Sequence, residues 1–199
     1  MEHTIIDSMK MRRSIYHLGN TLPITTDQLE ATVKEAVRLA PSAFNSQTAR
    51  ALILYGDEND WLWDLVWQKV KPLLAEGQAQ STKAKLAAFN SGAGTILFFE
   101  EMAIVSQLEK DFPLYSENFR LWSQHASGLT QFAVWTALAE QQVGASLQHY
   151  GNLIEADVLA HYGLSESWSL IAQMPFGSIE SEAPAKQFGN IEDRVLVKR

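Results

Sequence analysis

The sequence predicts an α+β fold in which helices flank a mixed β-sheet of about four strands. Four short apolar runs are bounded by turn residues, as buried strands are. Apolar positions at helical spacing fill most of the chain between these runs. The chain has 199 residues, of which 46% are hydrophobic, so it can bury one core but is short for two domains.

The first two elements are helices. A short helix opens the chain, with the apolar residues of 5–9 on one face. Residues 25–28, Thr-Thr-Asp-Gln, form the pattern of a capping box, which begins a second helix. That helix runs to Ala40, because Pro41 keeps the residue before it out of helical geometry.

The remaining elements alternate between strands and helices. We expect strands at 51–55, 95–99, 145–147 and 169–174, and helices over 61–70, 85–89, 102–110, 121–142 and 152–161, with a loose polar segment at 75–81. Gly144 is expected to end the long helix in left-handed geometry, and Asn152 to cap the last one. The long helix has so few charges that it must be covered on most of its circumference, inside the fold or in a dimer interface.

The last segment, 177–199, has little core of its own. It contains Pro184 and Gly189, lacks a helical period, and ends on a β-like run at 194–197. We therefore expect one domain over 1–199, with 177–199 as an extended arm.

Composition and charge exclude several classes of function. A net charge of −7 and a pI of 5.2 oppose binding to nucleic acid or to an anionic membrane. The chain has no cysteine, so thiolate catalysis, disulfides and cysteine metal sites are excluded. Its histidines show no pairing with carboxylates at ligand spacing, and we expect no metal site. No apolar run is long enough to span a membrane and residues 1–10 do not resemble a signal peptide, so we expect a cytoplasmic protein.

Two polar segments indicate a ligand site. Ser42, Asn45, Ser46 and Gln47 follow the second helix and offer donors and acceptors that suit a heteroaromatic ring. The run Arg12-Arg13-Ser14 offers two cations and a hydroxyl that suit a phosphate. Taken separately, the first is also typical of a plain turn and the second of a solvated surface. Together they favour a nucleotide-like cofactor.

Four segments carry a resemblance to a known family. They are Arg12-Arg13-Ser14-Ile15-Tyr16, Ala40-Pro41-Ser42-Ala43-Phe44-Asn45-Ser46-Gln47, Leu147-Gln148-His149-Tyr150 and Gln173-Met174-Pro175-Phe176-Gly177. In this order, and over nearly the whole chain, they resemble the nitroreductase family and within it the Frm2-like branch. The resemblance implies the nitroreductase-like fold and a domain-entwined homodimer that binds two FMN at its interface. It also implies that the C-terminal arm reaches the partner subunit and adds a strand there.

The resemblance implies a set of FMN-binding residues. They are Arg12, Arg13, Ser14, Tyr16, Pro41, Ser42, Asn45, Gln47, Lys85, Leu147, Gln148, His149, Gly177 and Lys186. Arg12 and Ser14 would hold the phosphate. The family's Lys-x-Arg pair reads Lys186-Gln187-Phe188 here, which leaves Arg13 as the expected second cation. Backbone amides of 147–149 would point at flavin N5, Lys85 would approach the N1 and O2 edge, and the loop 41–47 would meet flavin bound mainly to the other subunit.

The implied function is that of an FMN-dependent oxidoreductase. NADH or NADPH would reduce flavin N5, and a nitroaromatic, a quinone or a similar acceptor would then be reduced, with ping-pong kinetics. No catalytic side chain is expected, and His149 as a general acid is a weak candidate. A flavin-binding regulatory or sensor protein of the stress response, with little turnover, stays open, as does a cofactor-free helical interaction protein.

Some further residues have expected places. Phe44, Phe119, Trp122 and His125 are candidates for the substrate pocket, which would take a small aromatic or quinone. The tryptophans of 61–67 are expected to pack in the core or an interface, and Glu100-Glu101 is expected to be a solvated strand end.

Overall fold

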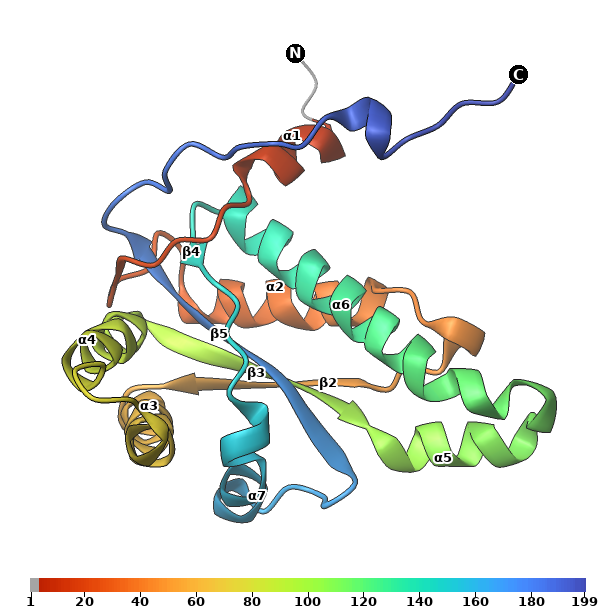
Figure 1. Ribbon diagram of the computed structural model, residues 1–199, viewed down its shortest axis with the longest axis horizontal. Helices are drawn as coiled ribbons and strands as arrows, with labels where there is room; N and C mark the ends of the chain where they lie inside the picture. The colour runs from red at the N-terminus through yellow and green to blue at the C-terminus, as the bar shows by residue number, and fades with distance from the viewer. Residues whose placement is uncertain (1–3) are drawn as a thin grey trace.

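The computed structural model describes residues 4–199, and it contains a central sheet with helices on both faces (Figure 1). The helices are α1 (Ile5–Met11), α2 (Thr26–Leu39), α3 (Asp57–Val70), α4 (Ala79–Asn90), α5 (Met102–Asp111), α6 (Ser116–Glu140) and α7 (Gly151–Tyr162). The strands are β1 (Leu18–Gly19), β2 (Ala49–Tyr55), β3 (Gly94–Glu101), β4 (Gly144–Ala145) and β5 (Trp168–Ile179). The expected helix-flanked sheet is therefore confirmed.

The sheet has the strand order β1-β5-β3-β2, and β4 pairs with β5. All its ladders are antiparallel, and a parallel pairing occurs as a bridge between Ser14 and Ala145. β3 lies in the middle and is buried along nearly its whole length. β2 is an edge strand, so within residues 4–199 one row of its backbone N–H and C=O groups has no strand partner.

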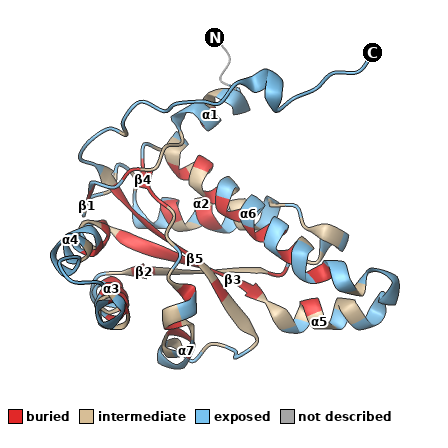
Figure 2. Ribbon diagram, in the orientation of Figure 1, coloured by how far each residue is buried: buried red, intermediate tan, exposed pale blue. Residues whose placement is uncertain are grey.

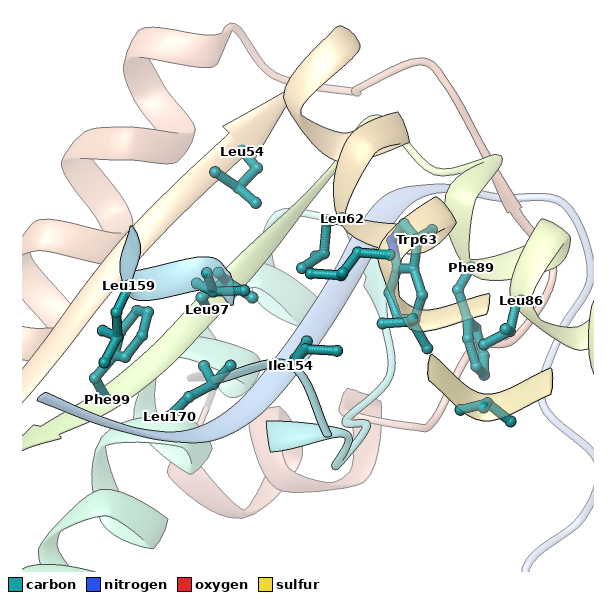
Figure 3. Close-up of a cluster of buried hydrophobic side chains, with 14 residues drawn as sticks. Leu54, Leu62, Trp63, Leu86, Phe89, Leu97, Phe99, Ile154, Leu159 and Leu170 are labelled. Carbon is teal, nitrogen blue, oxygen red and sulfur yellow. The ribbon is translucent and has the colours of Figure 1, made fainter. Parts of the chain in front are cut away.

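The two faces of β3 belong to two hydrophobic clusters, because side chains alternate along a strand. Leu97 and Phe99 pack against residues of α3, α4 and α7, among them Trp63 (Figure 3). Ile96 and Phe98 pack on the other face, against α2 and α6. The indole N–H of Trp63 donates to the hydroxyl of Thr95 at 3.0 Å, so this tryptophan has the core role expected for it.

Several expected element boundaries differ from the structure. α4 begins at Ala79, inside the segment expected to be loose, α6 begins five residues before the expected start, and β1 was not expected. The prediction for Gly144 is wrong: α6 ends at Glu140, Gln142 takes the positive φ of 61°, and Gly144 lies in β4. A Cβ on Gly144 would lie 2.9 Å from the side chain of Ile179, so close packing of strands explains this glycine. Asn152 is not the cap of α7, which Tyr150 precedes.

The arm leaves the sheet after Ile179 and is exposed over most of its length (Figure 2). It contains a short 3-10 helix at Ile191–Asp193, and residues 194–197 form no strand in this chain. The addition of this run to a partner's sheet stays a prediction. Within residues 4–199 no helix has the length and apolar character that crossing a membrane requires.

Candidate functional site

The arginine pair lies where α1 ends. A capping box between Thr4 and Asp7 starts this helix, and Arg12 is its C-cap. The Arg12 guanidinium lies 4.3 Å from the ring centroid of Trp135, and burial, together with the charge of Arg13, lowers its pKa. Within residues 4–199 the Arg12 guanidinium has no hydrogen bond or ion pair, so its N–H groups are available to an anion.

The neighbouring residues tie this end to two distant segments. The Arg13 guanidinium donates to the backbone carbonyl of Pro184 in the arm at 2.6 Å. Ser14 forms its bridge with Ala145, and the N–H of Ile15 donates to the carbonyl of Ala145 at 2.9 Å. The predicted phosphate end is therefore held beside β4 and the residues that follow it.

In the segment 147–150, two backbone N–H groups bond within the fold and two remain available to a ligand. The N–H of Gln148 donates to the carbonyl of Gln173 at 2.7 Å, and that of Tyr150 to the side-chain carbonyl of Gln173 at 2.6 Å. The N–H groups of Leu147 and His149 have no partner within residues 4–199. Amide donation to a ligand is thus available from Leu147 and His149, whereas the Gln148 amide is already used in the sheet.

Two predicted cofactor residues lie near this segment. Lys85 on α4 places its ammonium group 6.0 Å from the ring centroid of Tyr150. The ring of Tyr16 lies 6.4 Å from that of Phe89, also on α4. The fold therefore brings the arginine end, Lys85 and the amides of 147–149 to one region.

The loop 41–47 is unusual in its backbone. Phe44, Asn45 and Gln47 have φ angles of 57°, 50° and 48°, in the left-handed region that side chains disfavour. The Ser42 hydroxyl accepts a hydrogen bond from the N–H of Gln47 at 2.9 Å. Each such residue costs about 1 kcal/mol or more, and strain of this kind clusters at functional sites.

A cavity of about 480 Å³ lies between this loop and α6. Its lining consists of Pro41, Ser42, Ala43 and Phe44 from the loop and Trp122, His125, Ala126 and Leu129 from the helix. Three of the four candidates for the substrate pocket therefore line it, and the fourth, Phe119, is buried against Phe44 with a ring-centroid distance of 5.3 Å.

Lys186 joins neither group, Gly177 pairs with β4 beside the arginine end, and the cavity that Arg13 lines contains no residue of the loop 41–47. Lys186 lies on the arm with its ammonium group 5.2 Å from the ring of Phe188. Gly177 pairs with Gly144, and a Cβ there would be 2.1 Å from the carbonyl oxygen of Gly19, so strand packing alone requires this glycine. Arg13 lines a separate cavity of about 270 Å³ beside Glu182, with none of the loop residues.

Glu100 is a buried acidic residue, which the sequence did not lead us to expect. Its assignment to a solvated strand end is wrong. The residue is fully buried, and neither carboxylate oxygen has a hydrogen bond within residues 4–199. Burial raises the pKa of Glu100 to about 7, and the neighbouring Thr48, Arg50 and Ser127 offset only part of this effect. The signal was the alternation along β3, since Glu100 follows Ile96 and Phe98 on the face that packs against α6.

Fold and site together define a class, an α+β protein with a helix-flanked antiparallel sheet and an arm. A sequence model of the Nitroreductase family matches residues 9–178, and the chain belongs to this family. The chain is accordingly an oxidoreductase. It is 34% identical over 177 residues to HBN1 of Saccharomyces cerevisiae, covering 88% of each chain, and 29% identical over 187 residues to the yeast nitroreductase FRM2, covering 93% of each.

Solved structures agree with this assignment. The nitroreductase CinD from Lactococcus lactis, in complex with nicotinic acid, is 46% identical with a TM-score of 0.90, over 98% of this chain and 100% of that one. A nitroreductase from Saccharomyces cerevisiae is 28% identical with a TM-score of 0.75, over 87% and 94%. A Desulfovibrio desulfuricans protein in complex with FMN is 18% identical with a TM-score of 0.72, over 100% and 99%, and it shows the shared fold.

Proposed function

We propose that this chain is an FMN-dependent NAD(P)H oxidoreductase of nitroreductase type, active as a homodimer. When bound, FMN supplies hydride chemistry at N5, from NADH or NADPH to a nitroaromatic, a quinone or a similar acceptor. The observation that carries the proposal is the convergence of Arg12, Ser14, Lys85 and the unpaired amides of Leu147 and His149 in one region. The phosphate needs cations and hydrogen-bond donors, which Arg12 and Ser14 provide. The flavin ring gains negative charge on reduction, and Lys85 and the amides of Leu147 and His149 can stabilise that charge.

The donor set fits FMN at both ends. Arg12 and Ser14 provide a guanidinium and a hydroxyl for the phosphate dianion, and Arg13 would add a second cation on leaving Pro184. The N–H groups of Leu147 and His149 would donate to the ring, and the Lys85 ammonium would stabilise negative charge there. None of these groups has to move a proton, so His149 needs no role as an acid.

The loop 41–47, called the ring loop below, would complete the site from a second copy of the chain. Within one chain, Ser42 and Arg13 line different cavities. A largely apolar groove of about 690 Å³ runs between α1, α2 and α6, where Leu39, Leu129 and Phe132 are exposed. An uncovered apolar face of this size supports a homodimer in which each loop meets the flavin of the other subunit.

The 480 Å³ cavity is the proposed acceptor site. The related CinD has been solved with nicotinic acid, chloramphenicol and 4-nitrophenol, which are all aromatic. The cavity of the present chain has aromatic walls, formed by Phe44 and Trp122, against which an aromatic ligand can pack. We therefore propose that acceptors are flat aromatic molecules.

Flavin binding and stopped-flow kinetics test the proposal. We expect the purified chain to bind FMN, to bleach rapidly with NADH or NADPH, and to recover its absorbance when a quinone or nitroaromatic is added. Initial rates should show ping-pong kinetics. A chain that binds no FMN would refute the proposal, and one that binds FMN without being reduced would indicate the regulatory function instead.

A further inference from the structure

The acceptor cavity has a rigid aromatic wall. The Phe44 ring stacks on Trp122 at 6.0 Å with an interplanar angle of 20°. It also lies 4.8 Å from Phe112 and 5.7 Å from Tyr115, so several rings hold it from behind. The cavity is therefore suited to a flat ring.

Polar groups are scarce in this cavity. The polar groups of its lining are the Ser42 hydroxyl, which accepts the N–H of Gln47, the indole N–H of Trp122 and the His125 ring. Trp122, His125 and Leu129 follow one another at spacings of three and four, which places them on one face of α6. His125 is the one titratable residue in this lining.

The side chain of His125 is exposed to solvent. Within residues 4–199 its ring forms no hydrogen bond and no ion pair. An imidazole always carries at least one N–H donor, which can bind a carboxylate or nitro oxygen. A donor without a protein partner in a largely apolar wall is typical of a group that orients a ligand.

We propose that His125 is a specificity-determining residue, which selects flat aromatic ligands that carry a carboxylate or nitro oxygen at the ring edge. The inference rests on the proposed function, since it assigns the acceptor class to the same cavity. Rings of equal size without a strong acceptor would bind by apolar contact alone. The hydrogen bond would discriminate between the two kinds of ligand by about tenfold, the size typical of a hydrogen bond to a charged group.

The test compares benzoate with toluene, two redox-inert rings of similar size, of which only benzoate carries an oxygen acceptor. Dissociation constants are measured on the FMN-loaded dimer from the change in flavin absorbance, and on the chain without FMN from tryptophan fluorescence. We expect His125→Phe to weaken benzoate about tenfold and toluene, which has no hydrogen-bond acceptor, less than twofold. His125→Gln retains an N–H donor and should recover most of the loss. Leu129→Ala is the matched control, and it should weaken both ligands alike.

Two outcomes would overturn the inference: equal weakening of benzoate and toluene by His125→Phe, or no change in either. Reduction of wild-type flavin by NADH is recorded separately. If the wild type is not reduced, the proposed function fails while the binding comparison still decides the role of His125. If the wild type is reduced but His125→Phe shows no selective loss, the inference alone fails.

Discussion

Arg50 donates a hydrogen bond from its guanidinium to the backbone carbonyl of Gln47 at 2.8 Å, and a second to that of Ala49 at 3.0 Å. Gln47 is a residue of the ring loop with positive φ, so the first bond holds a strained peptide unit in place. The loop therefore depends on a residue of β2 that contacts no predicted ligand.

Replacing Arg50 should loosen the loop without unfolding the sheet. We expect Arg50→Met to raise the FMN dissociation constant by about tenfold, since the charged hydrogen bond to the loop residue Gln47 is lost together with that to Ala49. Fluorescence titration with FMN measures it. Arg38→Met is the control, because among residues 4–199 Arg38 pairs with the exposed Glu35 on α2 and with no backbone group of the loop. Equal effects of the two substitutions would show that the bond to Gln47 is unimportant.

The phosphate end should account for a large part of cofactor affinity. Arg12→Ala combined with Ser14→Ala removes a guanidinium and a hydroxyl, and we expect FMN binding to weaken roughly 100-fold or more. Riboflavin, which has no phosphate, should bind the variant and the wild type about equally. A parallel loss for riboflavin would mean that the substitutions act on the ring site.

Glu100 should make stability depend on pH. Its pKa is about 7 in the folded chain against an ordinary value of 4.5, so between these values the folded state holds the extra proton. The free energy of unfolding therefore falls as pH rises from about 4.5 to 7 and stays level above. We expect Glu100→Gln to be more stable than the wild type at pH 8 by about 1–3 kcal/mol, and similar to it near pH 4.5. Urea unfolding at both pH values measures this.

Glu101 is the matched control for Glu100. Burial raises its pKa, but hydrogen bonds from Ser167, the Ala103 N–H and Trp168 together lower it below the ordinary value. The charged form is thus favoured in the folded chain, and Glu101→Gln should lose stability at neutral pH. If both substitutions shifted stability in the same direction, the assignment of Glu100 would be wrong.

The backbone strain at Gln47 should be separable from the proposed contact of its side chain with the flavin ring. Glycine adopts positive φ without cost, so Gln47→Gly is expected to raise the free energy of unfolding by up to about 1 kcal/mol. The same change removes the amide side chain proposed to contact the ring, and turnover should fall. Thermal unfolding and steady-state rates report the two effects. A variant with lower stability and full activity would contradict both assignments.

Much of the fold could be predicted because its signals are local. Pro41 ends α2, the capping box at Thr25 begins it, and the apolar runs match β2, β3 and β5. Gly144 was misassigned because a glycine after a helix has two uses, and here the approach of Ile179, far along the chain, decides between them. β1 is too short for its two residues to show a pattern.

The site was predictable only in part. Arg12, Ser14 and the 147–149 segment carry family motifs, whereas the pairing of Arg13 with Pro184 and the use of the Gln148 amide depend on distant strands. The alternation along β3 places Glu100 on the face of Ile96 and Phe98, but its burial also needs the cover of α6, which lies far along the chain.

The open edge of β2 has a consequence for handling this protein. A solitary copy offers an unprotected row of peptide groups, onto which any extended segment can hydrogen-bond. Strand addition between copies at this edge joins two molecules or more, so insoluble material should accumulate faster as the protein is concentrated.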